Sequence, residues 1–465
     1  MPSWAADAPR AAGRFVGPGG GRGLRILVGA AEIAGQLPVY ADGFRRLGHR
    51  VTTVVHSRND FYPDLEYDFE IRPKIIAWPD AVRRSSSPPV RLARGGVNRL
   101  WAAADSSSRS ALLLRLMARH DLFVFQWAGL SLWQGNREYP FLKKIGKRIV
   151  AICNGDDVRH WSSYDQQHAA VGMREINLRG YGDFYQNDPL SRPLRNLRMA
   201  ERYADLVLSV PNQSGLAVRP YARFYYPLNL SQYSYEVPGR EVPVVVHAPS
   251  AKSIKGTQAI ESTLDRLRSE GVPFEFRLLH GVPNAQVLTA LAAADVAVEQ
   301  LPIPSYGRLG AEAMASGCAL ATCSREEFEP IPPGRPIWHI DYENLYDRLK
   351  TLLTDRELRM RLAREGRQYV EKYHDHVGIA RQVLAHLGGG AEYDYYPSFF
   401  AKRYGLPHGE VVPPDLKRMT AQVVRRWGLP EGVEPEDLVA RGLMSADGLG
   451  PPPIPRWAAS PSAAT

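Results

Sequence analysis

Short apolar runs alternate with longer amphipathic segments along most of the chain. Runs bounded by glycine or polar residues are typical of buried strands, and apolar residues at helical spacing fill the segments between them. The predicted strands are 24–28, 51–55, 74–78, 121–126, 148–152, 205–210, 244–247, 274–279, 296–298, 318–322 and 336–340. Strands that alternate with helices form parallel sheets covered by helices on both faces. The sequence therefore predicts an α/β protein with two Rossmann-like halves.

The predicted helices and the gaps between them suggest the domain boundaries. The helices are 33–47, 111–120, 258–270, 284–293, 308–316, 343–353, 356–373, 377–387 and 415–427. Residues 159–200 are polar and irregular, and residues 224–235, which contain Pro227, lack a helical period and are the expected linker. We therefore expect a disordered arm, an N-terminal domain, a C-terminal domain and a partly disordered extension at 1–22, 23–228, 242–387 and 388–465.

The stretch 294–320 carries the strongest single signal. A short strand is followed by two prolines and then by a helix of small residues that Gly317 is placed to end. Glu312 lies among alanines in this helix, and an isolated carboxylate would be costly to bury there. It needs a partner, and the sequence leaves two choices open. Either ligand hydroxyls reach it near the helix start, or it pairs with an arginine or reaches solvent.

Three loops of the second half should meet at one sheet edge, because each follows a parallel strand. Lys252 and Lys255 follow the first of these strands, with Gly256 allowing a close backbone approach. Gly281 follows a later strand. The next loop runs through Ser305, Tyr306, Gly307 and Arg308 to Glu312. Lysines beside a helix start suit a diphosphate, and a nearby carboxylate suits ribose hydroxyls.

Two loops of the first half are further candidates. Ala30, Ala31 and Glu32 follow the first strand, but this loop lacks the three-glycine dinucleotide fingerprint, so no nicotinamide site is expected. Asn154 and Asp157 follow the strand 148–152 and would also lie at a carboxyl edge. The alternative for these two residues is an Asx turn that caps the next helix.

The motifs HAPSAKSIKGT, LLHGVP, ADVAVEQL and YGRLGAEAMASG occur in this order in the second half. Together they resemble the nucleotide-sugar domain of GT-B glycosyltransferases of the retaining group 1, or family 4, type. The resemblance covers residues 242–387 well and 24–228 in outline. It implies transfer of a sugar from a nucleoside diphosphate donor to an acceptor glycan, lipid or small molecule. It also implies that no bound metal or other cofactor is needed, because basic side chains and helix amides offset the diphosphate charge.

The resemblance assigns roles to individual residues. Lys255 matches the diphosphate lysine, and Glu312 matches the second glutamate of a paired motif that holds ribose. Lys255, Asn154 and Asp157 are the predicted catalytic residues, and Ala30, Ala31 and Glu32 form the predicted acceptor-side loop. The chain departs from the family pattern at Pro304, Ser250 and Asn154, where the first glutamate, a basic residue and a histidine would fall. These departures leave two hypotheses open: an active glycosyltransferase, or a related binding or scaffolding protein that has lost turnover.

Composition adds constraints on partners and compartment. The net charge of +9 favours anionic partners, although a solvated arginine-rich surface would explain it equally. No aromatic-basic nucleic-acid motif is present, so no nucleic-acid partner is expected. Three cysteines without metal-ligand spacing, and no apolar run long enough to span a bilayer, indicate a cytoplasmic protein. Residues 81–119 hold eight arginines and one acid, and they either rest on an anionic membrane or form a solvated face.

Overall fold

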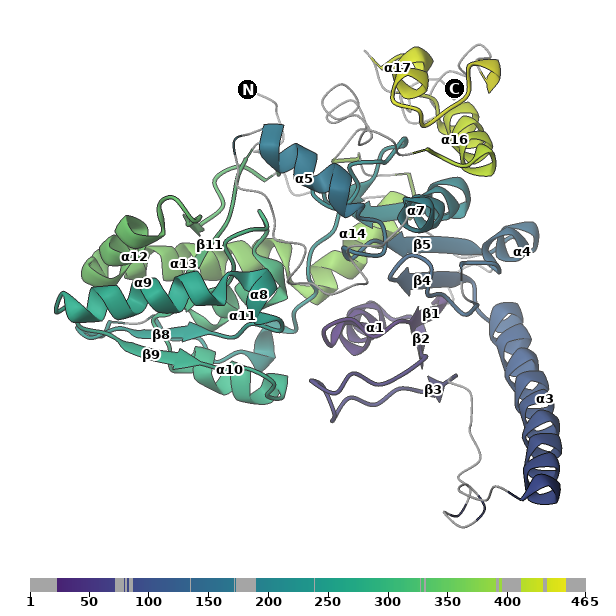
Figure 1. The fold of residues 1–465 in the computed structure, drawn as a ribbon, viewed down its shortest axis with the longest axis horizontal. Helices are drawn as coiled ribbons and strands as arrows, with labels where there is room; N and C mark the ends of the chain where they lie inside the picture. The colour runs from purple at the N-terminus through teal and green to yellow at the C-terminus, as the bar shows by residue number, and fades with distance from the viewer. Residues whose placement is uncertain are drawn as a thin grey trace.

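The computed structural model describes residues 23–71, 79, 82, 87–133, 135–170, 172, 190–237, 239–326, 328–329, 332–389, 393–394, 411–429 and 433–448. The predicted arm at 1–22, the predicted strand at 74–78 and the stretch after Gly448 lie outside these residues. Within the described part, two parallel sheets flanked by helices occupy separate lobes (Figure 1). The predicted α/β architecture is thereby confirmed.

The first sheet has seven parallel strands in the order β3-β2-β1-β4-β5-β6-β7. Their bounds are β1 Arg25–Ala30, β2 Arg50–Val55, β3 Phe69–Glu70, β4 Leu122–Gln126, β5 Arg148–Ile152, β6 Leu206–Ser209 and β7 Ala222–Arg223. The inner strand β1 pairs with β2 on one side and with β4 on the other, so Ile26 lies between Val51 and Leu122. Because both faces of this sheet are covered, β1 and β4 read as mostly apolar runs without alternation, apart from Arg25 and Gln126 at their ends.

The second sheet has five parallel strands in the order β12-β11-β10-β8-β9. Their bounds are β8 Val244–His247, β9 Glu275–Leu278, β10 Val296–Val298, β11 Ala319–Thr322 and β12 Trp338–His339. The strand order turns back between β8 and β10, which are neighbours although β9 lies between them in sequence. Such reversals leave a crevice beyond the carboxyl ends of the strands, where ligands bind in α/β folds.

The helices confirm most of the predicted positions. Their bounds are α1 Gln36–Arg46, α3 Pro88–Arg119, α4 Tyr139–Lys144, α5 Trp161–Ala170, α7 Ser191–Tyr203, α8 Lys252–Lys255, α9 Thr257–Ser269, α10 Asn284–Ala292, α11 Gly307–Ser316, α12 Leu345–Thr354, α13 Arg356–Tyr373, α14 His376–Leu387, α16 Pro414–Trp427 and α17 Pro435–Ala440. Two expectations were wrong. Residues 159–200, expected to be irregular, contain α5 and α7. The helix expected at 111–120 begins at Pro88, because proline is tolerated in the first helical turn.

The chain crosses between the two lobes twice, and the two crossings lie side by side. The Leu228 amide donates to the His374 carbonyl at 2.8 Å, and the His376 amide donates to the Leu228 carbonyl at 3.1 Å. After the second crossing, α14 packs against α1, with Ile379 and Val383 in the same core as the first sheet. The range 242–387 therefore ends in a helix that belongs to the first lobe by its packing.

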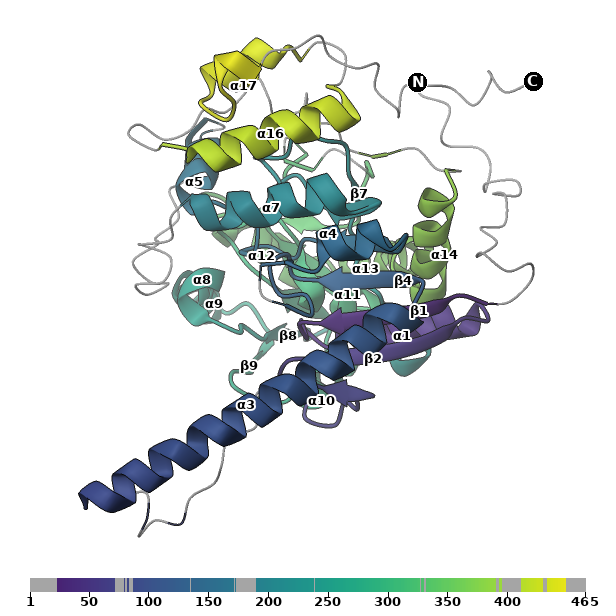
Figure 2. The ribbon, with the colours of Figure 1, turned by 90° about the vertical axis from the view of Figure 1, so that its right-hand side faces the viewer.

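The C-terminal extension also packs on the first lobe. Helix α16 lies along α7, and Leu416 shares an apolar core with Leu194 and Leu197 (Figure 2). The fully buried Arg198 guanidinium donates to the Thr420 hydroxyl at 2.7 Å. Burial of these side chains anchors the described part of the extension, which explains why a polar tail is helical at 414–427.

Candidate functional site

A cavity of about 650 Å³ lies between the two lobes. It is bounded by the loops that follow β1, β2, β4 and β5 in the first sheet and by those that follow β8, β9 and β10 in the second. All these loops leave the carboxyl ends of parallel strands, so the two sheets present their ligand-binding edges to each other. Its volume suits a ligand of cofactor or nucleotide-sugar size.

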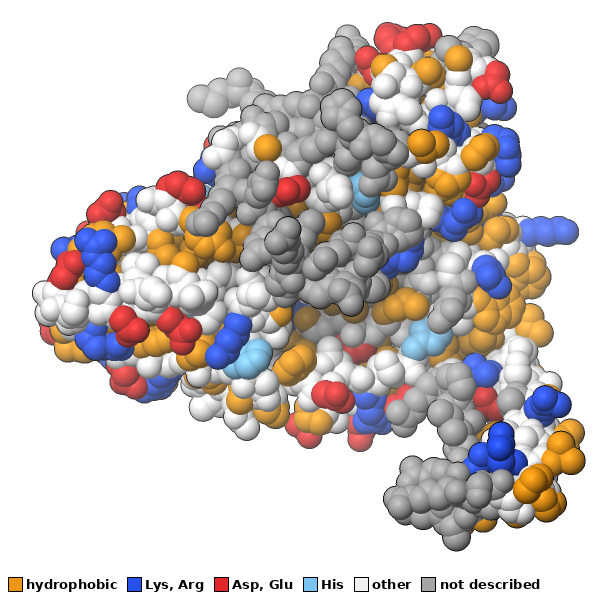
Figure 3. All heavy atoms as spheres, in the orientation of Figure 1, with side chains coloured by type: hydrophobic (Ala, Val, Ile, Leu, Met, Phe, Trp, Pro, Cys, Tyr) orange, Lys and Arg blue, Asp and Glu red, His pale blue; other side chains and the backbone are white. Residues whose placement is uncertain are grey.

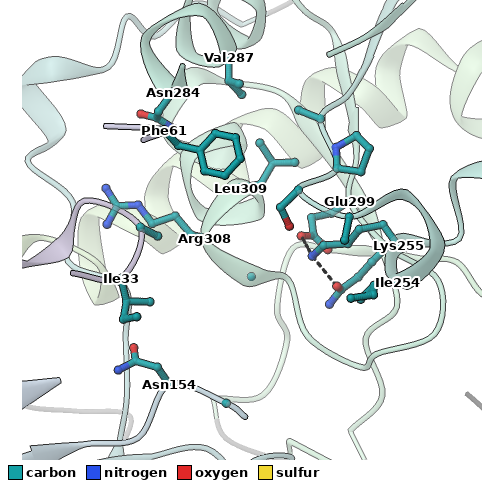
Figure 4. A pocket seen from close by; sticks show the side chains of 18 of the residues that line it. Ile33, Phe61, Asn154, Ile254, Lys255, Asn284, Val287, Glu299, Arg308 and Leu309 are labelled. Atoms are coloured by element: carbon teal, nitrogen blue, oxygen red, sulfur yellow. Dashed lines mark hydrogen bonds and ion pairs between the residues drawn. The ribbon is translucent and has the colours of Figure 1, made fainter. Parts of the chain in front are cut away.

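Lys255 extends into this cavity from the end of α8. Its Nζ lies 2.5 Å from Glu299 Oε1 and 2.6 Å from Gln300 Oε1, as the dashed lines in Figure 4 show. Burial raises the pKa of the Glu299 carboxyl, and the nearby Lys255 ammonium opposes that rise. Glu299 Oε2 has no hydrogen-bond partner among the described residues. The ammonium is therefore held in place by two acceptors while one carboxylate oxygen remains available.

The start of α11 forms the floor beside Lys255. Gly307 lines the cavity with a φ of +57°, and a Cβ there would lie 2.9 Å from Glu299 Oε1. Glycine is therefore required on both conformational and steric grounds. The first amides of α11 carry the partial positive charge of a helix N-terminus. Together with Lys255 they make this wall of the cavity attractive to anions.

Glu312 lines the cavity and is almost fully buried. Its Oε1 accepts a hydrogen bond from Arg308 Nε at 2.9 Å, and its Oε2 accepts one from Asn284 Nδ2 at 3.2 Å. The Tyr233 hydroxyl is 3.5 Å from Oε1. The predicted arginine partner is therefore present, one turn earlier on the same helix. Contact with ligand hydroxyls stays a prediction, for which the carboxylate is correctly placed.

Arg308 joins the cavity to the crossing between the lobes. Its guanidinium donates to Glu312 and, through Nη1, to the Pro227 carbonyl at 3.2 Å. Tyr306, by contrast, is buried away from the cavity, and its hydroxyl lies 3.0 Å from His374 Nε2. Burial lowers the pKa of His374 to about 3, so the ring is neutral and can accept from Tyr306 while donating through Nδ1 to the Tyr226 carbonyl. This part of the predicted loop contacts the crossing and not the cavity.

The remaining predicted donor residues divide in the same way. Gly281 lines the cavity, but Lys252 and Ser305 do not. Lys252 is exposed at the start of α8, and the Ser305 hydroxyl accepts from the Gly307 amide at 3.3 Å. Gly256 separates α8 from α9 with a φ of +75°, which lets Lys255 turn toward β10.

On the opposite wall, Asn154 lines the cavity but Asp157 does not. Asp157 is fully buried and accepts from the backbone amides of Ala128 and Gly155 at 2.7 Å and of Asn154 at 3.1 Å. Burial raises the pKa of Asp157 to about 6, although these three donors oppose the rise. The carboxylate therefore ties the loops after β4 and β5 together and positions Asn154. Direct contact of Asp157 with a substrate is not supported by this geometry.

Asn154 has an unused hydrogen-bonding atom at the cavity. Its Nδ2 donates to the Ile152 carbonyl at 3.3 Å, whereas its buried Oδ1 has no partner among the described residues. Buried polar atoms are rarely left unpaired in folded proteins. Asn154 Oδ1 can therefore accept a hydrogen bond from a ligand group.

The predicted acceptor-side loop lies just behind the cavity. Ala30 and Ala31 are buried, and Glu32 accepts from the Gln36 amide at 3.0 Å and from the Tyr67 hydroxyl at 2.8 Å. Burial raises the pKa of the Glu32 carboxyl, and these donors partly offset it. The next residues, 33, 34 and 36, line the cavity instead. The Gln36 side chain is fully buried, and neither of its amide atoms has a partner among the described residues.

Sequence reasoning missed several residues that line the cavity. They are Gln36, Tyr62, Trp127, Arg159, Asn284, Glu299 and Gln300. Glu299 and Gln300 could have been found, because they follow β10 directly and precede two prolines. Trp127 could have been found in the same way, because it follows β4 directly. Tyr62 carried no signal. It lies in the loop after β2, which contacts α10 where the Asn284 amide donates to the Phe61 carbonyl at 2.9 Å.

The described residues contain no group of three or more His, Cys, Asp or Glu residues arranged to hold a metal ion. None of the helices in the described part combines the length and hydropathy needed to cross a bilayer.

No protein-family model matches the sequence, and no curated protein matches it. Three solved glycosyltransferases illustrate what the chain resembles in structure. Sucrose-phosphate synthase from Thermosynechococcus elongatus has 15% identity and a TM-score of 0.48, and the match covers 78% of this chain and 97% of that one. The catalytic domain of starch synthase IV from Arabidopsis thaliana, bound to ADP and acarbose, has 15% identity and a TM-score of 0.45, and the match covers 79% of this chain and 99% of that one. WaaG, a glycosyltransferase of lipopolysaccharide biosynthesis, has 14% identity and a TM-score of 0.44, and the match covers 79% of this chain and 100% of that one. At these values the likeness assigns no activity, which must come from the chemistry of the cleft.

Proposed function

We propose that this protein is a glycosyltransferase that moves a sugar from a nucleoside diphosphate sugar to a hydroxyl group of an acceptor. One observation carries the proposal. Lys255, the first amides of α11 and Glu312 line the same wall of a cavity of about 650 Å³ between two parallel sheets. A cation, a helix N-terminus and a carboxylate in this order suit a diphosphate followed by a ribose.

The donor would bind along the second-lobe wall. Its diphosphate would lie between Lys255 and the start of α11, where the ammonium and the helix amides would both attract its negative charge. Its ribose would lie against Glu312, which Arg308 and Asn284 hold in position. Lys255 would contribute most in the transition state, because negative charge grows on the diphosphate as the sugar leaves. The proposed transfer proceeds with retention and uses these side chains in place of a metal.

Glu299 is the proposed contact for the donor sugar. The family pattern places a glutamate at Pro304, which cannot donate or accept through its side chain. Glu299 reaches the same cavity from the end of β10 and keeps one carboxylate oxygen without a partner among the described residues. Sugar hydroxyls would satisfy that oxygen. The departure at Pro304 would then be offset by a carboxylate from the neighbouring strand end.

The acceptor would bind against the first-lobe wall. Gln36 and Asn154 there offer buried amide atoms that lack partners among the described residues. An acceptor hydroxyl can both donate to and accept from such amides. As the bond between the sugar C1 and the diphosphate oxygen breaks, the acceptor oxygen bonds to C1 and its proton passes to the leaving diphosphate. No side chain at position 154 is then required as a base.

The alternative is a protein that binds nucleotide sugars without efficient turnover. It is favoured by the loss of the histidine expected at Asn154 and by the engagement of Lys255 with Glu299 and Gln300. Both functions predict donor binding, so binding alone does not separate them. Only the transferase predicts turnover, so turnover is the measurement that distinguishes the two.

The test has two stages. Nucleoside diphosphate sugars are first screened by thermal shift, since a ligand at a hundred times its dissociation constant stabilises the folded state by about 2.7 kcal/mol. Release of nucleoside diphosphate from the best donor is then measured with and without candidate acceptors. Acceptor-dependent release supports the transferase. Tight donor binding without release above the buffer rate supports the alternative, and absence of any binding contradicts both.

A further inference from the structure

Helix α3 is long, and few of its side chains are buried. It has 32 residues and extends away from the first lobe in Figures 1 and 2. From 88 to 112, leaving out residue 102, which is not described, no side chain is buried. Core contacts begin only at Leu113, Leu116 and Met117. A helix that buries little apolar surface gains little stability from tertiary packing, and adjacent glycines at 95 and 96 weaken it further. Burial of its apolar side chains against a partner would therefore stabilise this segment.

The exposed side of α3 carries an apolar stripe. Leu92, Leu100 and Leu114 are 81%, 75% and 49% exposed, and their spacing of eight and fourteen residues places them on one face of a helix. Ala103 and Ala111 lie on the same face and are also exposed. Large apolar side chains that share one exposed face indicate an interaction surface, unlike scattered single ones.

Helix α4 extends this stripe onto the body of the protein. Phe141 and Ile145 are exposed at a spacing of four residues at the end of α4. The segment just after α4 adjoins the end of α3, because Lys147 Nζ donates to the Ala118 carbonyl at 3.2 Å. Both helices lie in front in Figure 2, and hydrophobic atoms gather along the same edge of the molecule in Figure 3.

Basic side chains flank the apolar residues. Arg91, Arg99, Arg115, Arg119 and Lys144 are exposed on α3 and α4. The acid of α3, Asp105, forms an ion pair with Arg109 at 2.7 Å. The α3/α4 surface is defined here by these five basic residues together with Leu92, Leu100, Leu114, Phe141 and Ile145. It combines an apolar stripe with a surplus of positive charge, which is the composition of helices that lie in a membrane interface.

We propose that the α3/α4 surface docks on an anionic lipid bilayer, with α3 lying in the plane of the headgroups. The leucines and Phe141 would insert between lipids, and the arginine stems would reach up to the phosphates. A second copy of the chain fits less well, because two such surfaces would bring like charges together. No described helix can span a bilayer, so the contact is peripheral. This inference does not depend on the proposed transferase activity.

The test measures binding of the full chain to vesicles by flotation. Vesicles of phosphatidylcholine alone are compared with vesicles that also contain phosphatidylglycerol, at low and at high salt. We expect binding to the anionic vesicles at low salt, at least tenfold weaker binding in 0.5 M salt, and little binding to phosphatidylcholine alone. Backbone amides between 88 and 112 should exchange more slowly with solvent when anionic vesicles are present, because the bound helix is protected.

Two pairs of variants separate the apolar from the electrostatic contribution. Leu92→Ser/Leu100→Ser and Arg91→Gln/Arg99→Gln both lie in the unpacked segment and should leave the fold intact. Each should weaken vesicle binding at least tenfold. The matched controls are Val242→Ser/Val411→Ser and Arg361→Gln/Arg364→Gln, which change exposed residues elsewhere. These should change binding less than twofold.

Three outcomes would overturn the proposal. The first is absence of binding to anionic vesicles at low salt. The second is equal weakening by the surface variants and by their controls, which would show a diffuse charge effect. The third is a concentration-dependent dimer that the Leu92→Ser/Leu100→Ser variant abolishes while vesicle binding is absent, which would assign the surface to a second copy. Donor binding, measured in parallel, reports separately on the proposed transferase.

Discussion

The two walls of the cleft differ in how their polar groups are satisfied. On the second-lobe wall the charged side chains hold one another, as in the pairs Lys255–Glu299 and Arg308–Glu312. The first-lobe wall also has a charged pair, Arg159–Asp156, but its amides Gln36 and Asn154 have buried atoms that lack partners among the described residues. Charges that are paired before the ligand arrives are already held in place, which suits the binding of one defined group. The amides of the first-lobe wall leave their hydrogen bonds to be completed by the ligand.

The largest effect is expected from Lys255→Met. Lys255 is the cation next to the leaving diphosphate, on which negative charge develops in the transition state. Its loss should lower the turnover number at saturating donor roughly a hundred- to a thousandfold. Binding of nucleoside diphosphates should also weaken, while the bare nucleoside is hardly affected. Steady-state kinetics and calorimetric titration of the three ligands measure both. Equal losses for nucleoside and nucleoside diphosphate would refute the assignment of Lys255 to the diphosphate.

Because Lys255→Met also leaves the Glu299 carboxylate buried without its cation, a second variant is needed. Lys255→Met/Glu299→Gln removes that uncompensated charge. Affinity for nucleoside diphosphate is the readout, because Glu299 is assigned to the donor sugar, which this ligand lacks. If the single variant lost that affinity only through unfolding, the double variant should recover it. We expect recovery of melting temperature without recovery of nucleoside diphosphate affinity.

Glu312→Gln should act on binding more than on the chemical step. Nucleoside, nucleoside diphosphate and nucleotide sugar all carry the ribose, so all three should weaken by roughly ten- to a hundredfold. A matched control is Glu371→Gln, which changes an i,i+4 Arg–Glu pair of the same kind, formed with Arg367 on α13. A loss of melting temperature in both variants, with no change in affinity, would give Glu312 a structural role only.

Asn154→Ala tests the amides of the first-lobe wall. Removal of one hydrogen-bonding side chain should lower turnover about tenfold and leave donor affinity unchanged. The shape of the pH–rate profile should also stay the same, because an amide does not titrate and the leaving diphosphate takes the proton. If a titration disappeared with this substitution, position 154 would influence a catalytic base and the proposed proton transfer would be wrong.

The last prediction concerns stability and not activity, and it tests Asp157, which supports the first-lobe wall from behind. Its folded pKa of about 6 exceeds the ordinary 3.8, so the folded state holds the proton more tightly and gains stability below pH 4. That gain is lost as the pH rises toward 6 and corresponds to roughly 3 kcal/mol. The free energy of unfolding of the wild type, minus that of Asp157→Asn, should therefore be larger at pH 4.5 than at pH 7. A difference independent of pH would contradict the buried, proton-binding carboxyl.

The sequence was a good guide to the second-lobe wall because the signals there are local. Each loop follows its own strand directly, and parallel strands bring their carboxyl ends to one edge whatever the rest of the chain does. Lys255, Gly281, Gly307, Arg308 and Glu312 accordingly line the cavity. Two exceptions are Ser305, which turns toward its own loop, and Tyr306, which turns toward the distant His374.

The first-lobe wall was predicted less well because its residues are brought together only by packing. Strand positions predicted the edge on which Asn154 lies, but not that Asp157 would turn inward to bind three backbone amides. Glu32 precedes α1, and Gln36 is its first residue. Which of the two faces the cavity depends on how the start of α1 packs against β1. The apolar pattern does not predict this packing.

The sequence by itself determined the alternation of strands and helices, and with it the two parallel sheets and the charged loops at the edge of the second. Apolar periodicity is sufficient for this, because it records which side of each element is buried. The tertiary structure decided the rest: that α14 and α16 pack on the first lobe, that Glu299 reaches the cavity, and that most described side chains of α3 are not buried. These depend on contacts between residues far apart in the chain, which a pattern of single positions does not contain.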